Sequence, residues 1–248
     1  MENKAEMALA QMRDLLQNMG SSSQSSYYGD DETLLRFLRA KSMSPEKAAK
    51  MFADWEKWRV EIAPSGSVDE AEIAAEFEAR KAYLQRPTKD GHPLVILQAC
   101  KHFAPKDQLQ FKKFVAYMLD KTIASGAKEE GGGSEKMVVI IDLQHLGLKN
   151  LDANGFLIGF QYLQSYYPEQ LEKLYILSMP WIFIGIWKMI SAFLEKAILE
   201  KVVIVNNDAQ KKEMIKEIGE EALPEDYGGL AQLTPIQDVK LSHWPTKN

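Results

Sequence analysis

The sequence predicts an α/β protein that begins with a small all-helical unit. Helical periodicity dominates the chain up to Ala82, whereas short apolar strands alternate with helices after Tyr83. Such alternation implies a mostly parallel sheet. With 248 residues, 46% of them hydrophobic, the chain is long enough to bury a core and an internal cavity without disulfides or metal. The single cysteine, Cys100, excludes an intramolecular disulfide and fits a reducing compartment.

The helical unit is expected over residues 1–82. Apolar side chains recur in it at three- and four-residue steps, which places them on one face of each helix. Aspartate and serine stand where helix N-caps are expected, and a proline follows the serine at a first helical position. The expected helices are Glu2–Met19, Asp30 or Asp31 to Lys41, Pro45 to beyond Trp58, and Ser67–Ala82, with a polar loop over Ser21–Ser26.

A second domain is expected over residues 83–238, followed by a tail over residues 239–248. Its strands are continuous apolar runs, as expected when both faces of a sheet are covered. The expected strands are Leu94–Leu97, Met137–Ile141, Leu174–Leu177 and Val202–Val205, and the expected helices are Asp107–Ser125, Asp152–Tyr167, Trp181–Glu195 and Ala209–Ile218. In the first of these helices, we expect apolar residues such as Phe111 to face the core and Lys121 to fall on the other side.

Charge and hydropathy exclude several classes of function. A net charge of −5 argues against a general nucleic-acid binder, which would carry a basic surplus. The uncharged apolar stretch Leu174–Trp187 has only fourteen residues, and a membrane-spanning helix needs about 20. Residues Met1–Gln17 lack the apolar segment of a secretory signal. We therefore expect a soluble cytoplasmic protein, and the absence of heptads favours a monomer.

No motif indicates an enzyme, a metal site or a cofactor. The chain has neither a Gly-x-Ser-x-Gly nucleophile elbow nor a Gly-x-Gly-x-x-Gly turn after a strand. Cys100 and His102 stand two residues apart, but no second pair completes a tetrahedral metal site. Gly131–Lys136 departs from a phosphate-binding loop, because no lysine directly follows its second glycine. We interpret it as a connector.

The helix that begins at Trp181 is apolar nearly all round. Only Lys188, Ser191 and Glu195 form a polar stripe, and they do so in its C-terminal half. Such a helix is either buried or in contact with lipid or an apolar partner. Burial in an ordinary core and a mobile lid over an apolar cavity are both compatible with this pattern.

Six short motifs recur in a specific order and spacing. They are Asp31–Lys41, Trp55–Arg59, Asp90–Pro93, Ile141–Leu143 with Gly147, Tyr166–Glu169 and Leu223–Gly229. Together they resemble the CRAL-TRIO family of lipid-binding and lipid-transfer proteins, of the phosphatidylinositol/phosphatidylcholine transfer type. The resemblance extends from about residue 30 to residue 238, which is nearly the whole chain.

The resemblance implies a sheet that forms the floor of a deep apolar pocket and a gate helix that covers it. The gate would be the helix from Trp181, which would open on a membrane surface. Phe183, Trp187, Ile190 and Phe193 would then be its gate and membrane-contact residues.

The resemblance also implies which side chains hold a lipid headgroup. The positions that bind inositol phosphate in the family carry Lys41, Glu169 and Lys201 in this chain, and two ammonium groups with one carboxylate suit a phosphate and ring hydroxyls. Ile198 stands where the family has a helpful threonine. Residues 137–139 read Met-Val-Val, where the family's phosphatidylcholine binders have two hydroxyl side chains. We therefore expect poor phosphatidylcholine binding by the family mode.

The function implied by the resemblance is lipid binding and exchange without chemical change. Phosphatidylinositol is the expected cargo, and a sterol or another apolar molecule is a candidate second ligand. The alternative is a phosphoinositide sensor or scaffold that presents lipid to a kinase or another partner. A carrier would move lipid between vesicles with no partner present, whereas a presenter would barely do so.

Overall fold

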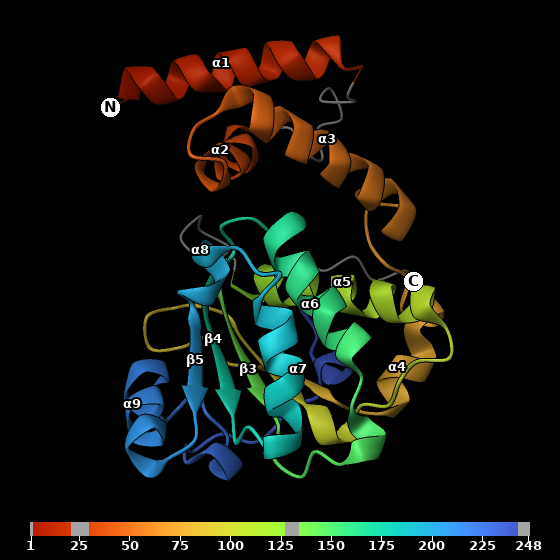
Figure 1. Ribbon diagram of the computed structural model, residues 1–248, viewed down its shortest axis with the longest axis vertical. Coiled ribbons are helices and arrows are strands. Elements are labelled where there is room, and N and C mark those ends of the chain that lie inside the picture. The colour runs from red at the N-terminus through yellow and green to blue at the C-terminus, as the bar shows by residue number, and fades with distance from the viewer. Residues whose placement is uncertain (1, 21–29, 127–133, 243–248) are drawn as a thin grey trace. The chain divides into compact units, whose positions relative to one another are not determined.

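The computed structural model describes residues 2–20, 30–126 and 134–242 (Figure 1). The expected loop over Ser21–Ser26 and the three glycines of the expected connector lie outside these ranges. The chain divides into two compact units, Met1–Val68 with Ser165–Glu169, and Asp69–Gln164 with Gln170–Asn248. Residues 69–82 belong to the second unit, where the segments Glu70–Ile73 and Ala74–Glu78 contact the helix Gln108–Ser125.

The first unit contains the helical region expected from the sequence. Its helices are α1 (Glu2–Asn18), α2 (Asp31–Ala40) and α3 (Pro45–Ile62). The Asp30 side chain caps α2 by accepting the Thr33 N–H at 2.6 Å. The helices share one apolar core, whose buried members include Met12, Leu16, Leu34, Phe37, Leu38 and Phe52.

Two of the sequence motifs meet inside this unit. Trp58 of α3 stacks on Tyr166 with ring centroids 4.1 Å apart, and Tyr167 meets the same indole edge-on at 5.9 Å. Aromatic pairs of this kind contribute about 0.5–1.5 kcal/mol beyond the area they bury. The segment Ser165–Glu169 therefore belongs to the helical unit, although the sequence places it in the middle of the α/β region.

The second unit is built on a five-stranded sheet in the order β1-β2-β3-β4-β5. β1 pairs with β2 antiparallel, and the other neighbouring strands pair in parallel, which confirms the expected mostly parallel sheet. The strands are β1 (Ala82–Gln85), β2 (Leu94–Gln98), β3 (Met137–Asp142), β4 (Leu171–Leu177) and β5 (Val202–Val205).

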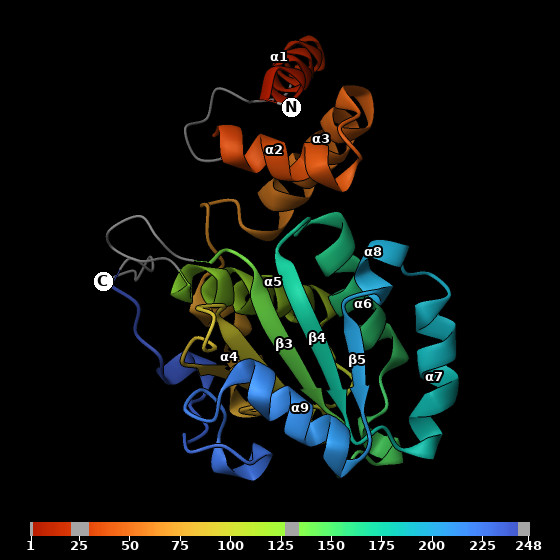
Figure 2. The same cartoon turned by 90° about the vertical axis from the view of Figure 1, so that its left-hand side faces the viewer.

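Helices cover both faces of this sheet. Because parallel crossovers are right-handed and the strand order is sequential, the helices that follow β2, β3 and β4 fall on one face. Figure 2 shows α9 across the sheet from α5 and α6. The helices are α5 (Gln108–Ser125), α6 (Ala153–Ser165), α7 (Trp181–Ser191), the short α8 (Lys196–Leu199) and α9 (Asp208–Ile218).

Alternation along the strands assigns each side chain to one of these two layers. Ile96, Ile140 and Tyr175 pack in a core with Met214 and Ile218 of α9. The residues between them on the same strands face α5 and α6. This second set includes Leu97, Val139, Ile141 and Leu174, which line a cavity.

The helix expected over Ser67–Ala82 is too long at both ends. Only Glu70–Ile73 (η1, a 3-10 turn) and Ala74–Glu78 (α4) are helical, and Arg80 with φ of 43° ends the helical run. The next residues form β1, a strand that the sequence analysis missed. Pairing with β2 leaves no pattern in the sequence of β1 itself, and a strand of four residues is too short to show an alternation of apolar and polar side chains.

Two smaller expectations are also corrected. α7 ends at Ser191 rather than Glu195, where a turn leads into α8. Lys121, expected on the side of α5 away from its apolar face, is only 2% exposed, and α5 packs against η1. Its ammonium group donates to the Tyr117 hydroxyl at 2.7 Å and lies 3.8 Å from Glu70.

Candidate functional site

A largely apolar cavity lies inside the second unit, between the sheet and helices α5 and α6. The space left unfilled by protein atoms is about 800 Å³, including its opening to solvent. Apart from three polar residues, its lining consists of apolar side chains and glycines. These are Leu97, Ala99, Val139, Ile141 and Leu174 on the sheet side, Phe111, Phe114, Val115, Met118 and Leu119 on α5, and Gly155, Phe156, Gly159, Phe160 and Leu163 on α6.

The three polar lining residues, Lys81, Gln98 and His102, lie at or beyond the ends of β1 and β2. The Lys81 carbonyl accepts the Gln98 N–H at 2.9 Å, which fixes the two residues beside each other. The Gln98 amide donates to the Tyr227 hydroxyl at 3.1 Å, and this hydroxyl donates to Asp142 at 2.9 Å. The cavity therefore has one polar end, at the carboxyl edge of β2.

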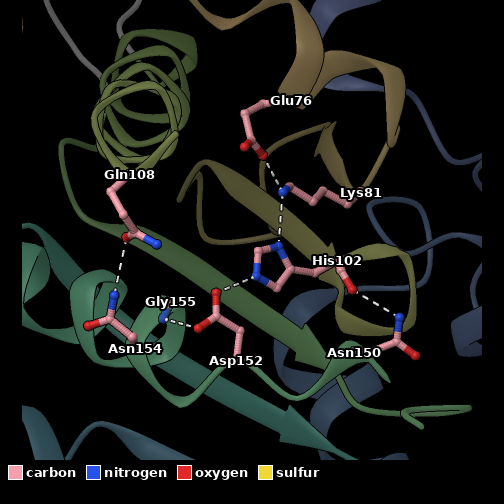
Figure 3. A network of polar contacts seen from close by, with 8 residues as sticks. All are labelled: Glu76, Lys81, His102, Gln108, Asn150, Asp152, Asn154 and Gly155. Carbon is pink, nitrogen blue, oxygen red and sulfur yellow. Dashed lines mark hydrogen bonds and ion pairs between the residues drawn. The ribbon is translucent and has the colours of Figure 1, made fainter. Parts of the chain in front are cut away.

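Glu76, Lys81, His102 and Asp152 form a buried chain of polar contacts, which we call the Lys81 cluster (Figure 3). The Lys81 ammonium donates to Glu76 Oε2 and lies 3.0 Å from His102 Nδ1. His102 Nε2 lies 2.9 Å from Asp152 Oδ2. Each of the four side chains belongs to a residue less than 10% exposed, so the cluster is shielded from solvent.

Local structure explains why these four groups meet. Asp152 caps α6, where its Oδ1 accepts the Gly155 N–H at 2.9 Å. Asn150 donates to the carbonyl groups of Cys100 and His102, both at 2.9 Å, and so fixes the turn that carries the imidazole. The loops after β2 and β3 therefore converge at the edge where ligands of open parallel sheets bind.

Burial sets the protonation of the cluster. Desolvation lowers the pKa of His102, and the neighbouring Lys81 charge lowers it further, so the imidazole is neutral at pH 7. Desolvation also lowers the pKa of Lys81, although Glu76 opposes the shift through a hydrogen bond and its charge.

The helix predicted to be the gate has one face buried against the protein and one face exposed to solvent. Phe183 and Ile190 are buried, with 1% and 0% exposed, and Phe183 packs on Phe156 of α6 at 4.7 Å. Trp187 is half-buried and contacts Phe160 at 5.7 Å. Of the four predicted contact residues, only Phe193 is exposed, at 66%.

Further apolar side chains on α7 face solvent. Trp181 is 83% exposed, and Ile184 and Met189 are 43% and 45% exposed. The sequence analysis did not single them out, because a helix that is apolar all round gives no periodic signal for its outer face. Large apolar groups exposed together on one short helix indicate an interaction surface.

The predicted headgroup residues are distributed over both units. Lys41 is the C-cap of α2, and Glu169 has a left-handed φ of 61° in the segment that joins the first unit; both are half-buried. Lys201 precedes β5 in the second unit, and its ammonium donates to the Leu171 carbonyl at 2.6 Å. Ile198, at the position of the family's threonine, is buried in α8. Their role as a headgroup site stays a prediction.

The strand predicted to disfavour phosphatidylcholine is β3. Met137, Val138 and Val139 are all buried in it, and Val139 lines the cavity. None of the β3 side chains carries a hydroxyl group. This strand therefore offers no hydroxyl donor to a phosphate in the cavity.

None of the helices in the described ranges is long and apolar enough to cross a membrane. Among the residues that the structure describes, no group of three or more histidine, cysteine, aspartate or glutamate side chains could hold a metal ion.

The cavity, its apolar lining and its covering helices define a protein that binds an apolar ligand. A model of the CRAL/TRIO domain matches residues 77–229, and a model of the CRAL/TRIO N-terminal domain matches residues 8–54. The chain belongs to the CRAL/TRIO family, a family of lipid-binding and lipid-transfer proteins. The expected family and fold are thereby confirmed.

Known proteins similar to this chain agree with that assignment. The CRAL-TRIO domain-containing protein YKL091C of Saccharomyces cerevisiae is 29% identical over 224 residues, covering 82% of this chain and 72% of the relative. The Sec14 cytosolic factor of Schizosaccharomyces pombe is 27% identical over 219 residues, covering 82% and 76%. The crystal structure of Sfh5 superposes with a TM-score of 0.63 at 13% identity, covering 94% of this chain and 93% of Sfh5, which shows a shared fold.

Proposed function

We propose that this protein carries one phosphatidylinositol molecule in the cavity, exchanges it at membrane surfaces and makes or breaks no bond. The observation that carries the proposal is the cavity, which is lined by apolar side chains over most of its surface. Burial of acyl chains in such a lining contributes about 25 cal/mol per Å² of apolar area, less the cost of ordering the chains.

Headgroup selection is assigned in this proposal to Lys41, Glu169 and Lys201. Their charges suit an inositol phosphate, since ammonium groups bind phosphate and a carboxylate accepts from ring hydroxyls. We also propose that phosphatidylcholine binds poorly, and the hydroxyl-free strand β3 supports this. The protein would act as a monomer in the cytoplasm and meet membranes only transiently, through the exposed face of α7.

Transfer of labelled lipid between vesicles tests the proposal with purified protein and no partner. We expect phosphatidylinositol to move at least about tenfold faster than phosphatidylcholine, because a charge-assisted contact contributes about 1.5–3 kcal/mol. Lys201→Ala should slow phosphatidylinositol transfer, and Lys41→Ala and Glu169→Ala should do the same. Lys196→Ala is the matched control, because this lysine is 89% exposed in its side chain and close in sequence.

Three results would contradict the proposal. Equal transfer of both phospholipids would remove the assigned headgroup selectivity. Lipid that binds but does not move between vesicles would favour a sensor or scaffold that presents lipid to a partner. Bound lipid recovered in chemically altered form would indicate an enzyme instead.

A further inference from the structure

We infer that the Lys81 cluster is a subsite inside the cavity for a neutral oxygen of the bound ligand, a hydroxyl or carbonyl group on an otherwise apolar molecule. The inference rests on the proposed function in one respect, namely that the cavity holds lipid. It adds the chemical class of ligand that the polar end of the cavity selects.

The first argument is a hydrogen-bond donor without an acceptor. An ammonium group has three N–H donors, and two of those on Lys81 are directed to Glu76 Oε2 and His102 Nδ1. Within the described ranges no oxygen or nitrogen accepts the third. Instead, the ammonium lies 5.2 Å and 5.1 Å from the ring centroids of Phe111 and Phe114, which line the cavity with Lys81 itself. An oxygen of a ligand in the cavity would accept a hydrogen bond from this third, buried N–H.

The second argument is that the neighbouring groups keep Lys81 a donor. Asp152 Oδ2 accepts from His102 Nε2 at 2.9 Å, so the imidazole carries its proton there and Nδ1 is left as an acceptor for Lys81. The Gly155 N–H in turn holds Asp152. Gly155 orients Asp152, Asp152 orients His102, and His102 orients Lys81. The loops after β2 and β3 therefore determine the orientation of the Lys81 ammonium group.

Charge selects the class of ligand. The cluster holds one lysine against two carboxyl groups, and burial keeps His102 neutral at pH 7 by lowering its pKa. A carboxylate or phosphate would therefore enter a buried site with no excess positive charge, which is costly. A neutral hydroxyl or carbonyl oxygen gains the hydrogen bond without this cost.

The position of the cluster separates it from the proposed headgroup residue Lys201. Lys201 precedes β5 at the amino edge of the parallel strands, where its carbonyl accepts the N–H of the cavity residue Leu174 at 2.9 Å. The cluster follows the carboxyl edge of β2. The end of a hydrocarbon chain that reached the cluster would leave the third N–H of Lys81 without an acceptor. A ligand with an oxygen at this depth is thus preferred over a plain chain.

Three probes of the same chain length test the inference. Labelled oleyl alcohol, oleate and octadecene are offered to the purified protein in phosphatidylcholine vesicles, and protein-bound label is counted after the vesicles are pelleted. After correction for partition into the vesicles, we expect oleyl alcohol to bind about tenfold or more better than octadecene, as one hydrogen bond to a charged donor implies. We expect oleate at pH 7.5 to bind more weakly than the alcohol.

Variants assign the preference to the cluster. Lys81→Met combined with Glu76→Gln removes the ion pair as a unit, so that no buried charge loses its partner. This variant should bind octadecene as tightly as the native protein does, and it should no longer bind oleyl alcohol more tightly than octadecene. Lys121→Met is the matched control, since Lys121 is a buried lysine on α5 that does not line the cavity. The Lys121→Met variant should still bind oleyl alcohol more tightly than octadecene.

A second measurement needs no variant. The carbonyl infrared band of ¹³C-labelled octadecan-2-one bound to the native protein should lie below its position in alkane solvent, because the oxygen accepts a hydrogen bond. A band at the alkane position, equal binding of alcohol and octadecene, tighter binding of oleate, or an advantage that survives the double substitution would each overturn the inference.

Failure of the proposed function would look different. The same preparations are assayed for phosphatidylinositol transfer between vesicles. Transfer without an alcohol preference would contradict the subsite and support the carrier function. An alcohol preference without transfer would contradict the carrier function and support the subsite. Protein that takes up no probe and no phospholipid overturns both.

Discussion

At the scale of single residues, the glycines of α6 show how closely the polar cluster is packed. A Cβ atom on Gly155 would lie 2.6 Å from Asp152 Oδ2 and 3.2 Å from His102 Nε2. Gly155→Ala should therefore separate Asp152 from His102 and lower the free energy of unfolding by about 1–3 kcal/mol. Urea unfolding followed by circular dichroism measures the change.

Gly159, one turn further along α6, provides the control. A Cβ atom there would meet nothing within 4 Å. Because alanine is favoured over glycine in a helix by about 0.8–1.0 kcal/mol, Gly159→Ala should leave stability unchanged or raise it. If both variants lost equal stability, tight packing around the cluster would not be the cause.

The protonation of His102 predicts how stability depends on pH. Its pKa in the folded protein lies below the ordinary value of 6.5, because burial and the Lys81 charge disfavour the imidazolium, although Asp152 and Glu76 oppose the shift. Between the folded pKa and 6.5, the unfolded chain binds more protons than the folded one. The free energy of unfolding should therefore fall as the pH is lowered through 6.5 and level off below the folded pKa.

Urea unfolding at a series of pH values between 7.5 and 5 tests this dependence. His102→Gln keeps a polar side chain of similar size but does not titrate, so it should flatten the part of the curve that His102 contributes. An unchanged slope in this variant would assign the pH dependence to other groups.

At the scale of elements, α7 divides its side chains between the protein and solvent. The double substitution of Trp181→Asp at the start of α7 and Phe193→Asp in the turn that follows it should slow lipid transfer at least about tenfold and weaken vesicle binding, since each removes an exposed apolar side chain that would enter the membrane interface. Stability should change by less than about 0.5 kcal/mol, because both positions are exposed. Vesicle co-sedimentation and the transfer assay give the two readouts.

Leu230→Asp is the control for this prediction. Leu230 is 69% exposed but lies outside α7, after η4 (Glu225–Tyr227). Its substitution should leave vesicle binding unchanged. A loss of binding that it shared with the α7 variant would indicate a general effect of negative charge rather than a membrane-contact face on α7.

Elements with a strong local signal could be predicted from the sequence. α2, α5 and the apolar strand β3 lie where capping residues and continuous apolar runs place them. β1 could not be predicted, because a four-residue strand is stabilised by its pairing with β2 and by the Leu84 N–H bond to the Thr234 carbonyl at 3.0 Å. Neither contact produces a recognisable pattern in the sequence around β1.

The candidate site was only partly predictable for a related reason. An apolar pocket follows from the resemblance to a family, but Lys81 was not singled out and His102 was considered only beside Cys100. The partners of these residues are separated from them by 5 to 50 positions. Only the folded chain shows that a lysine next to an apolar strand and a lone histidine belong to one cluster.

At the scale of the whole molecule, ligand binding should stabilise the two units unequally. The cavity is lined by residues of the second unit alone, whereas α1, α2 and α3 have their own core in the first. Lipid at about 100 times its dissociation constant stabilises the state that binds it by about 2.7 kcal/mol. Amides of β2, β3, α5 and α6 should therefore exchange up to about a hundredfold more slowly in lipid-loaded protein.

Hydrogen exchange read by mass spectrometry compares the lipid-free and loaded forms peptide by peptide. Peptides from the buried turns of α1 and α3 serve as an internal reference, because these helices do not line the cavity and carry none of the proposed headgroup residues. Lipid-dependent protection that was equal in both units would show that the chain responds to its ligand as one cooperative body. Protection confined to the reference helices would contradict a cavity between the sheet and α5 and α6, and would move the ligand to another site.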